Sequence, residues 1–297
     1  MKIGMINGIL SAAFIGILLS LTKICIVNLP VVFFSMVLFG GTHFIFLVVL
    51  LIRHKGGLIW AAGRRYPELY LVGLLASALN LMQNWGLKLS SPANVAILLR
   101  GDLFFSLIIG YVIWKQKLCR LEWAGMGAML VGVSLVLQIS WSRVNFGSMG
   151  DFLILGGALL LAVNAEIIKH RLGEVEGILV AYYNSGMCFA VFLCGTAWTG
   201  AFRALPEVNR ETWLLVLTSI FLQVVQYLAY YRSIKGLPTW LVRVVHLFTP
   251  VVAIVTSSWW LHETISFVQI GGMLLVGSGI ALICRVHAQK SLAGLLT

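Results

Sequence analysis

The chain has 297 residues, of which 60% are hydrophobic and only 10% are charged, and its mean hydropathy is +0.97. A soluble domain of this size needs a far more charged surface, so the composition excludes an ordinary soluble protein. The formal net charge of +11 does not indicate a nucleic-acid partner, because the basic residues stand between apolar runs. We attribute the charge to contact with anionic lipid headgroups.

Ten apolar segments follow one another along the chain, and each is about long enough to cross a bilayer as a helix. They are residues 4–25, 31–52, 69–88, 94–114, 122–140, 150–169, 178–200, 212–233, 239–260 and 266–285. The gaps contain charged residues, Pro or Gly and leave no room for a soluble domain. The sequence therefore predicts an all-α integral membrane protein with ten transmembrane helices.

The basic residues favour one side of this arrangement. With alternate loops assigned to two sides, the N-terminal side holds Lys2, Arg53, Lys55, Arg64, Arg65, Lys115, Lys117, Arg120, Lys169, Arg171, Arg232, Lys235, Arg285 and Lys290. The other side holds Lys88, Arg143, Arg203 and Arg210. Because cytoplasmic loops carry the excess of Lys and Arg, we expect both termini in the cytoplasm, which requires an even number of spans.

Signatures of catalysis, metal binding and disulfide bonding are missing from the sequence. The cysteines, which lie in or at the ends of apolar runs, are Cys25, Cys119, Cys188, Cys194 and Cys284. No P-loop, HExxH or GxSxG motif is present. We therefore predict no enzymatic activity, no cofactor, no metal and no disulfide.

The two halves of the chain resemble each other. Gln223, Gln226 and Arg243 each stand 143 residues after Asn80, Gln83 and Arg100, and Gly272 stands 145 residues after Gly127. We predict two five-helix repeats, residues 1–145 and 146–297. Five is an odd number, so the second repeat is inverted relative to the first. Inverted repeats are typical of secondary transporters, with the substrate site at the repeat interface near the midplane.

The order of segments resembles the drug/metabolite transporter superfamily, and within it the EamA-like ten-helix transporters. The stretches that carry the resemblance are residues 91–100, 249–266 and 269–279. The family often has a Pro in the fourth span and a Gly-Glu after it, where this chain has Asp102, Leu107 and Lys115-Gln116-Lys117. The resemblance implies export or exchange of metabolites, amino acids or nucleotide-linked compounds, and a location in a bacterial inner membrane.

Charged residues inside apolar spans are the strongest functional candidates, because burying a charge in a bilayer costs ~3 kcal/mol or more. Arg100 and Arg243 lie in the first two turns of the fourth and ninth spans, where a guanidinium favours a carboxylate or phosphate. The alternative for each is that it snorkels to the headgroups or pairs internally. His246 shares the helical face of Arg243 and is a ligand, a proton carrier or a packing residue.

Three further charged residues are candidates for coupling or gating. Asp102 follows Arg100 by two residues, about 200° around a helix, so we expect the two to face different neighbours. It either carries a coupling proton or pairs with a cation on another helix. Lys23 and Glu166 occupy corresponding positions in the two halves and could form a gate or a structural ion pair. Glu166 is also a candidate proton carrier.

Amides and aromatic residues recur in the third and eighth spans. The third carries Asn80, Gln83, Asn84 and Trp85, and the eighth carries Gln223, Gln226 and Tyr227. Either these amides hold helices together in lipid, or they line a cavity that binds a polar solute, with Trp85 and Tyr227 stacking on it. The Gly-rich fifth and tenth spans indicate close packing at the periphery or at a homodimer face; the protein is a monomer or a homodimer.

We therefore expect a secondary transporter, an exporter of small amino-acid-like, amphipathic or anionic solutes that works by alternating access and is coupled to protons or to exchange. Its partners are a small-molecule substrate and the lipid bilayer. The alternatives are a membrane scaffold or sensor that does not transport, and an intramembrane enzyme acting on lipid-linked substrates. The scattered acidic residues and histidines argue against the enzyme, and the buried Arg100 and Arg243 argue against the scaffold.

Overall fold

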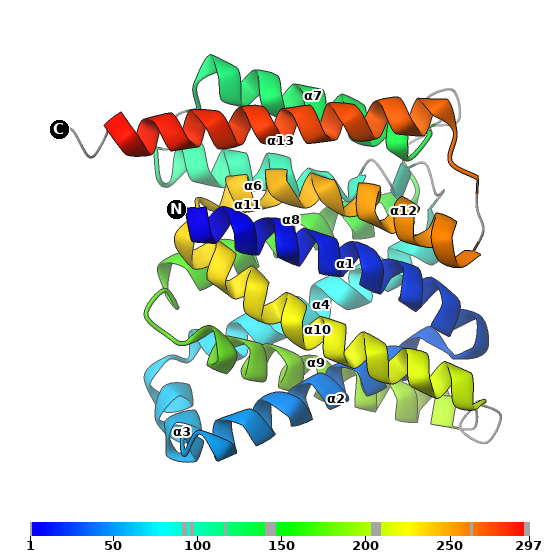
Figure 1. Ribbon diagram of the computed structural model, residues 1–297. Coiled ribbons are helices and arrows are strands. Elements are labelled where there is room, and N and C mark those ends of the chain that lie inside the picture. Colours follow the sequence, from blue (N-terminus) through cyan, green and yellow to red (C-terminus); the bar gives the residue numbers. More distant parts are fainter. Residues whose placement is uncertain are drawn as a thin grey trace.

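The computed structural model describes residues 2–90, 94–95, 98–115, 118–139, 147–202, 209–261 and 264–293, and all regular secondary structure in these ranges is helical (Figure 1). This confirms the all-α class. The predicted boundary between the two halves, at residues 145 and 146, lies outside the described residues, as do Lys117, Arg143 and Arg203.

Among its described residues, the first half contains one named helix more than we expected. Its helices are α1 (Lys2–Asn28), α2 (Val31–Ile52), α3 (Gly56–Arg65), α4 (Glu68–Leu89), α6 (Gly101–Val112) and α7 (Arg120–Val136). The helix missed by the hydropathy pattern is α3, whose 10 residues are too few to span a bilayer. Pro30 and Pro67 stand directly before α2 and α4, where the absence of an N–H costs nothing.

The second half is bounded by clear helix start and stop signals. Its helices are α8 (Met149–His170), α9 (Gly177–Thr199), α10 (Arg210–Gly236), α11 (Thr239–Val245), the 3-10 turn η3 (His246–Phe248), α12 (Thr249–Leu261) and α13 (Phe267–Ala293). Ser148 and Asp151 cap the start of α8 reciprocally. Gly200 ends α9 with φ +66°, a left-handed conformation that favours glycine.

The predicted fourth and ninth spans are not continuous α-helices. In the fourth, residues 99–100 form a turn and α6 begins only at Gly101. In the ninth, η3 separates α11 from α12. Pro250 explains the second break, because it has no N–H to bond the carbonyl of His246 four residues earlier. Hydropathy over a window of ~19 residues averages across such breaks, so the sequence did not reveal them.

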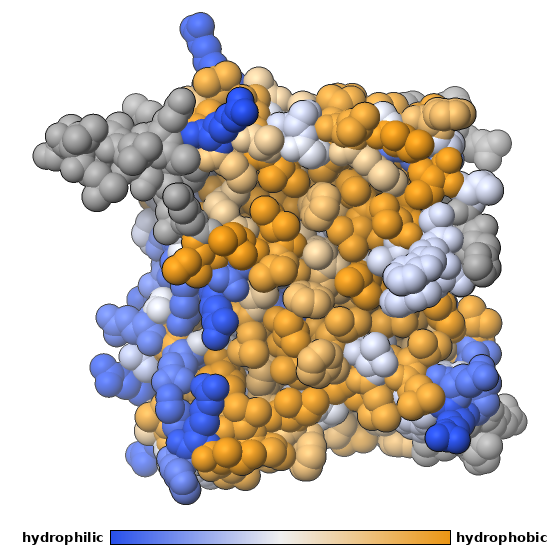
Figure 2. Space-filling model, viewed as in Figure 1, coloured by the Kyte–Doolittle hydropathy of each residue, from blue (hydrophilic) through white to orange (hydrophobic). Residues whose placement is uncertain are grey.

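The outer surface is that of a protein embedded in lipid. Seven described segments are long and apolar enough to cross a membrane: α1, α2, α8, α9, α10, the α11–α12 segment and α13. Figure 2 shows a broad apolar surface, with hydrophilic side chains gathered toward its two opposite edges. Large side chains such as Phe267 and Leu274 are exposed on this surface. The chain is thus a multi-pass integral membrane protein.

The helices pack in pairs that join the two halves. Helix α1 packs on α10, α4 on α8, α2 on α9, and α7 on α13. The last pair lies at one edge of the bundle (Figure 1) and approaches closely at two glycines. A Cβ on Gly132 would lie 2.7 Å from the carbonyl oxygen of Gly272, and a Cβ on Gly272 would lie 2.6 Å from that of Gly132. Only glycine permits this spacing.

One end of the bundle carries most of the charge, and we call it the charge-rich end. The start of α1 and the end of α13 lie there (Figure 1), together with the ends of α2, α8 and α10 and the start of α4. Its described charged residues include Arg53, Lys55, Arg64, Arg65, Glu68, His170, Arg171, Glu176 and Lys235. Lys55 pairs with Glu176 across it and so joins the end of α2 to the start of α9.

Candidate functional site

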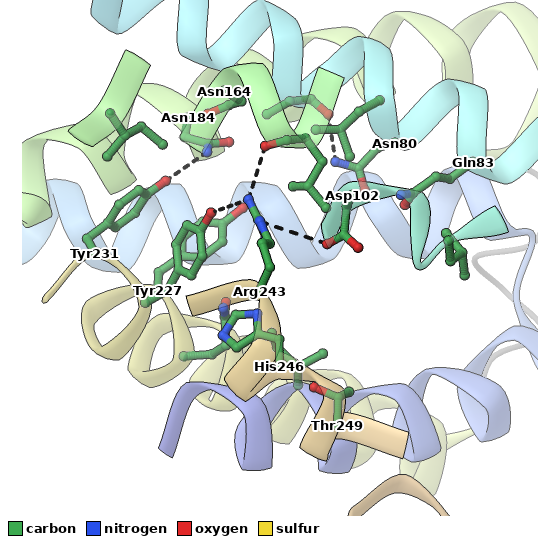
Figure 3. A pocket seen from close by; sticks show the side chains of 18 of the residues that line it. Asn80, Gln83, Asp102, Asn164, Asn184, Tyr227, Tyr231, Arg243, His246 and Thr249 are labelled. Atoms are coloured by element: carbon green, nitrogen blue, oxygen red, sulfur yellow. Dashed lines mark hydrogen bonds and ion pairs between the residues drawn. The ribbon is translucent and has the colours of Figure 1, made fainter. Parts of the chain in front are cut away.

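A cavity of about 290 Å³ lies among the helices of both halves (Figure 3). Side chains of α1, α4, α8, α9 and α10 form its walls. The interrupted fourth and ninth segments also line it, through residues 99, 100 and 102 and through Arg243, His246 and Thr249. Helix interruptions at membrane depth are tolerated where they line a cavity, so these breaks coincide with the place where a solute site is expected.

Arg243 is the best-connected charged residue of the cavity. Its Nη2 donates to the carbonyl oxygen of Leu161 at 3.0 Å and to the Tyr230 hydroxyl at 2.9 Å. Its Nε lies 3.8 Å from Oδ2 of Asp102 (Figure 3). The residue is only 4% exposed. The guanidinium is therefore fixed in direction by two neutral oxygens while its charge is balanced only by a distant carboxylate.

Arg100 and Asp102 lie on the same cavity, contrary to the expectation that they face different neighbours. The reason is that Arg100 is the N-cap residue of α6, outside the regular helix, so helical spacing does not apply to the pair. Asp102 lies in the first turn of α6, where its Oδ1 accepts the N–H of Leu103 at 2.8 Å. The negative carboxylate at a helix start is favoured by the helix dipole.

Three buried nitrogens at the cavity lack a hydrogen-bond partner among the described residues. They are Nε of Arg100, Nε of Arg243 and Nε2 of His246. Buried polar groups in proteins are nearly always hydrogen-bonded, so unsatisfied ones indicate a ligand or water. Two guanidinium groups face one carboxylate here, which leaves the cavity with an excess positive charge.

The amide residues divide between the cavity and the helix contacts. Asn80 and Gln83 line the cavity, although Nδ2 of Asn80 also donates to the carbonyl oxygen of Ala76 on its own helix. Gln226 lines it and bonds Ser11 of α1 at 3.3 Å. Gln223 is buried and Asn84 is half-buried, but neither lines the cavity. Of the amides predicted in the third and eighth spans, Asn80, Gln83 and Gln226 therefore line the cavity.

The aromatic wall comes from α10 alone. Tyr227, Tyr230 and Tyr231 line the cavity, and the Tyr227 ring is parallel to that of Phe46 at 6.4 Å between centroids. Trp85 does not join them, because its side chain is 65% exposed and lies outside the cavity. Each residue along a helix turns the side chain by about 100°, so Trp85 points away from the face that carries Gln83.

Several polar cavity residues were not predicted from the sequence, among them Asn164, Asn184 and Tyr230. Asn164 donates to the carbonyl oxygen of Val72 at 2.9 Å, and Asn184 donates to the Tyr231 hydroxyl at 2.8 Å. Tyr230 bonds Arg243. Both asparagines are amides inside apolar spans, so the rule applied to Asn80 would have found them. The sequence holds no signal that separates Tyr230 from its tyrosine neighbours.

Glu166 and Lys23 are not brought together. The Glu166 carboxylate accepts from the Thr239 hydroxyl and lies 3.2 Å from Nε2 of His170, at the charge-rich end. Gly4 of α1 lies at that same end, against Leu237. Lys23 stands 19 residues further along α1, a rise of ~28 Å in a helix. The predicted gate or ion pair between Glu166 and Lys23 is therefore wrong, and neither residue lines the cavity.

Comparison of the sequence with known protein families identifies the family of this chain. Its residues 2–138 and 148–285 each match the EamA-like transporter family. The chain belongs to this family. The resemblance seen in the sequence is thereby confirmed. EamA-like proteins are membrane transporters and not enzymes, which excludes the intramembrane enzyme considered above.

Individual EamA-like relatives cover most of the chain at low identity. A protein of Salmonella typhimurium named "Probable amino-acid metabolite efflux pump" is 23% identical over 238 residues, 72% of this chain and 80% of the relative. A protein of Escherichia coli with the same name is 22% identical, over 79% and 88% of the two chains. One crystal structure matches with a TM-score of 0.76 at 16% identity, over 97% of this chain and 98% of the other, which shows a shared fold.

Proposed function

We propose that the protein is a secondary transporter that exports small amphipathic solutes carrying a carboxylate, and that the cavity between the two halves binds them. The unsatisfied nitrogens of Arg100, Arg243 and His246 carry this proposal. A carboxylate accepts several N–H donors at once and balances the excess positive charge of the cavity. The proposed direction of transport follows the relatives named as efflux pumps.

The cavity sets limits on the rest of the solute. Its volume of about 290 Å³ is at the lower end of small-molecule sites, so it suits a metabolite of amino-acid size. Tyr227, Tyr230 and Tyr231 offer ring faces and edges to an apolar side chain. Asn80, Gln83 and Gln226 offer amide groups to the polar end. An amino acid or a related metabolite has all three matching parts.

We propose that ten helices span the membrane as two inverted repeats, residues 1–145 and 146–297. The helix pairs support this, because exchange of the two halves turns the α1–α10 pair into the α8–α4 pair and the α1–α12 pair into the α8–α6 pair. The α2–α9 and α7–α13 pairs correspond to themselves. The separate family match of each half gives further support. Alternating access then follows from rocking of the repeats about the cavity.

Release of the solute requires a competitor for the arginines. Asp102 lies 3.8 Å from Arg243, so its carboxylate competes there with a solute carboxylate. We propose Asp102 and Glu166 as the candidates for a coupling proton, with solute exchange as the alternative. Asp102 lines the cavity, so a change in its charge acts directly on the binding groups, whereas Glu166 acts through its contacts with Thr239 and His170.

A counterflow screen in proteoliposomes tests the proposed function. Vesicles loaded with an unlabelled metabolite should accumulate the same labelled metabolite, and amino acids with apolar side chains should give the strongest signal. The screen is run with and without a pH gradient, which separates proton coupling from exchange. Absence of counterflow for carboxylated solutes, together with robust counterflow of neutral or cationic ones, contradicts the proposal.

A further inference from the structure

The cavity is separated from the charge-rich end by a short barrier. Asn164 and Ile168 of α8 line the cavity, whereas His170, two residues further on, lines a hollow on the surface of the charge-rich end. Glu166 lies on the same helix, between Asn164 and His170. Around it Ala165, Ile168 and Leu172 are at most 1% exposed. The buried wall between the cavity and this end is therefore short, because Ile168 and His170 are only two residues apart on α8.

Three contacts tie α6, α8 and α11 into a closed ring around this barrier. Asp102 of α6 faces Arg243 of α11. Thr239, at the other end of α11, donates to the carboxylate of Glu166 on α8. The ring of His170, at the end of α8, stacks on Trp114 just beyond α6, with 3.5 Å between the ring centroids. Each of the three helices is therefore held by two of these contacts.

Glu166 joins two of these contacts. One carboxylate oxygen accepts from Thr239, and the other lies 3.2 Å from Nε2 of His170. The Glu166 side chain is only 9% exposed, so its bond with Thr239 is shielded from water. The His170 side chain is 26% exposed, and its contact with Glu166 is an electrostatic approach without a hydrogen bond. The same residue therefore fixes the start of α11 and the orientation of the His170 ring against Trp114.

We propose that Glu166, with Thr239 and His170, is the gate that holds the cavity closed at the charge-rich end. This inference rests on the proposed function and extends it to the regulation of the site. A solute carboxylate at Arg243 displaces Asp102 and so opens the α6–α11 contact at the cavity end of the ring. Separation of α11 from α8 then requires the bond between Glu166 and Thr239 to break. It also requires loss of the bonds from Arg243 to the Leu161 carbonyl oxygen and from Lys169 to the Leu237 carbonyl oxygen. Glu166 acts as a positioning residue and does not touch the solute.

Sided labelling of a cysteine in the cavity tests the gate. The reporter is Ala76→Cys on α4, which lines the cavity, in a background with the five native cysteines replaced by serine. A small membrane-impermeant methanethiosulfonate reagent is applied to vesicles of each orientation. Arg64→Cys, exposed on α3, identifies the vesicles in which the reagent reaches the charge-rich end.

The gate variants are Thr239→Val and Glu166→Gln. Each should raise the labelling rate of the reporter from the charge-rich end by about tenfold. Thr239→Val removes the hydrogen bond to the buried carboxylate, and Glu166→Gln removes the charge that strengthens this bond. The matched control is Thr196→Val, whose buried hydroxyl bonds only the carbonyl oxygen of Phe192 on its own helix. Thr239→Ser keeps the hydroxyl and should label at the rate of the unsubstituted protein.

Labelling requires no solute, so it separates the gate from the proposed function. An unchanged labelling rate in both folded gate variants overturns the gate, even if counterflow is active. An equal increase in Thr196→Val or Thr239→Ser also overturns it, because the effect is then general loosening. Increased labelling in the gate variants alone, with no counterflow of any solute, supports the gate and rejects transport of carboxylated solutes. If one gate variant does not fold, the other decides.

Discussion

Among the described residues that line the cavity, Asp102 is the only carboxylate, and it faces a guanidinium that has further donors to offer. At 3.8 Å the two charges attract each other without forming a hydrogen bond. A solute carboxylate able to approach more closely therefore competes well with Asp102. Asp102 thus lowers the affinity of the cavity for the solute. A transporter needs this, because a solute bound too tightly is not released.

Asp102→Asn should tighten solute binding and slow transport. Removal of the competing charge is worth roughly 1 kcal/mol, which corresponds to about a fivefold lower KM in counterflow together with a lower maximum rate. Ser106→Ala, one turn further along α6, removes a buried hydroxyl outside the cavity and serves as the control. An unchanged or raised KM in Asp102→Asn would contradict the role given to this carboxylate.

The polar residues of the cavity are the part of the site that a sequence reveals best. Eight predicted residues line the cavity: Asn80, Gln83, Arg100, Asp102, Gln226, Tyr227, Arg243 and His246. The high cost of polar groups in lipid explains this, since such residues must face the protein interior. The direction of a side chain is harder to predict, as Trp85 shows. Contact to a solute stays a prediction for all of them.

At the scale of elements, close packing at glycines in the α7–α13 pair accompanies a polar contact, in which Nε2 of Gln269 donates to the carbonyl oxygen of Val136 at 3.2 Å. Gly272→Ala places a Cβ 2.6 Å from the carbonyl oxygen of Gly132, so the two helices must move apart. We expect a loss of about 1–3 kcal/mol in stability, seen as a lower Tm in detergent. Gly271→Ala is the matched control, because a Cβ there meets nothing within 4 Å. Equal Tm values for the two variants would refute the close approach.

The two interrupted segments could not be predicted from the pattern of apolar residues. A break needs only one or two residues to leave helical geometry, and hydropathy does not change there. Pro250 marked one break in the sequence, whereas the turn at Leu99 and Arg100 has no comparable signal. The short helix α3 was missed for the opposite reason, since its Gly and Arg residues dilute its apolar character.

At the scale of the whole molecule, the start of α1 and the end of α13 share the charge-rich end (Figure 1). We expect this end in the cytoplasm because of its excess of Lys and Arg. A green fluorescent protein fused after Thr297 should then fluoresce, and alkaline phosphatase fused there should be inactive. A matched fusion after Gly200, at the opposite end of α9, should give the reverse pattern. Active phosphatase at the C-terminus would contradict the orientation.

Charge distribution and hydropathy are properties of many residues at once, so the sequence predicted the all-helical membrane fold and the family well. Which helices touch depends on side-chain shape at each interface. Nothing in the apolar pattern of α1 indicates that it packs on α10, or that Gly16 approaches the carbonyl oxygen of Thr249. The position of the cavity, and the ring around Glu166, therefore emerged only from the structure.

Competition in counterflow between a carboxylated solute and its neutral amide tests whether Arg100 and Arg243 bind a carboxylate. For the unsubstituted protein, we predict that the carboxylate inhibits counterflow at least about tenfold better than the amide of the same compound. The reason is that charge-assisted hydrogen bonds are lost in the amide. In Arg100→Gln this preference should shrink while counterflow persists. Equal inhibition by the two compounds in the unsubstituted protein would contradict a carboxylate site at Arg100 and Arg243.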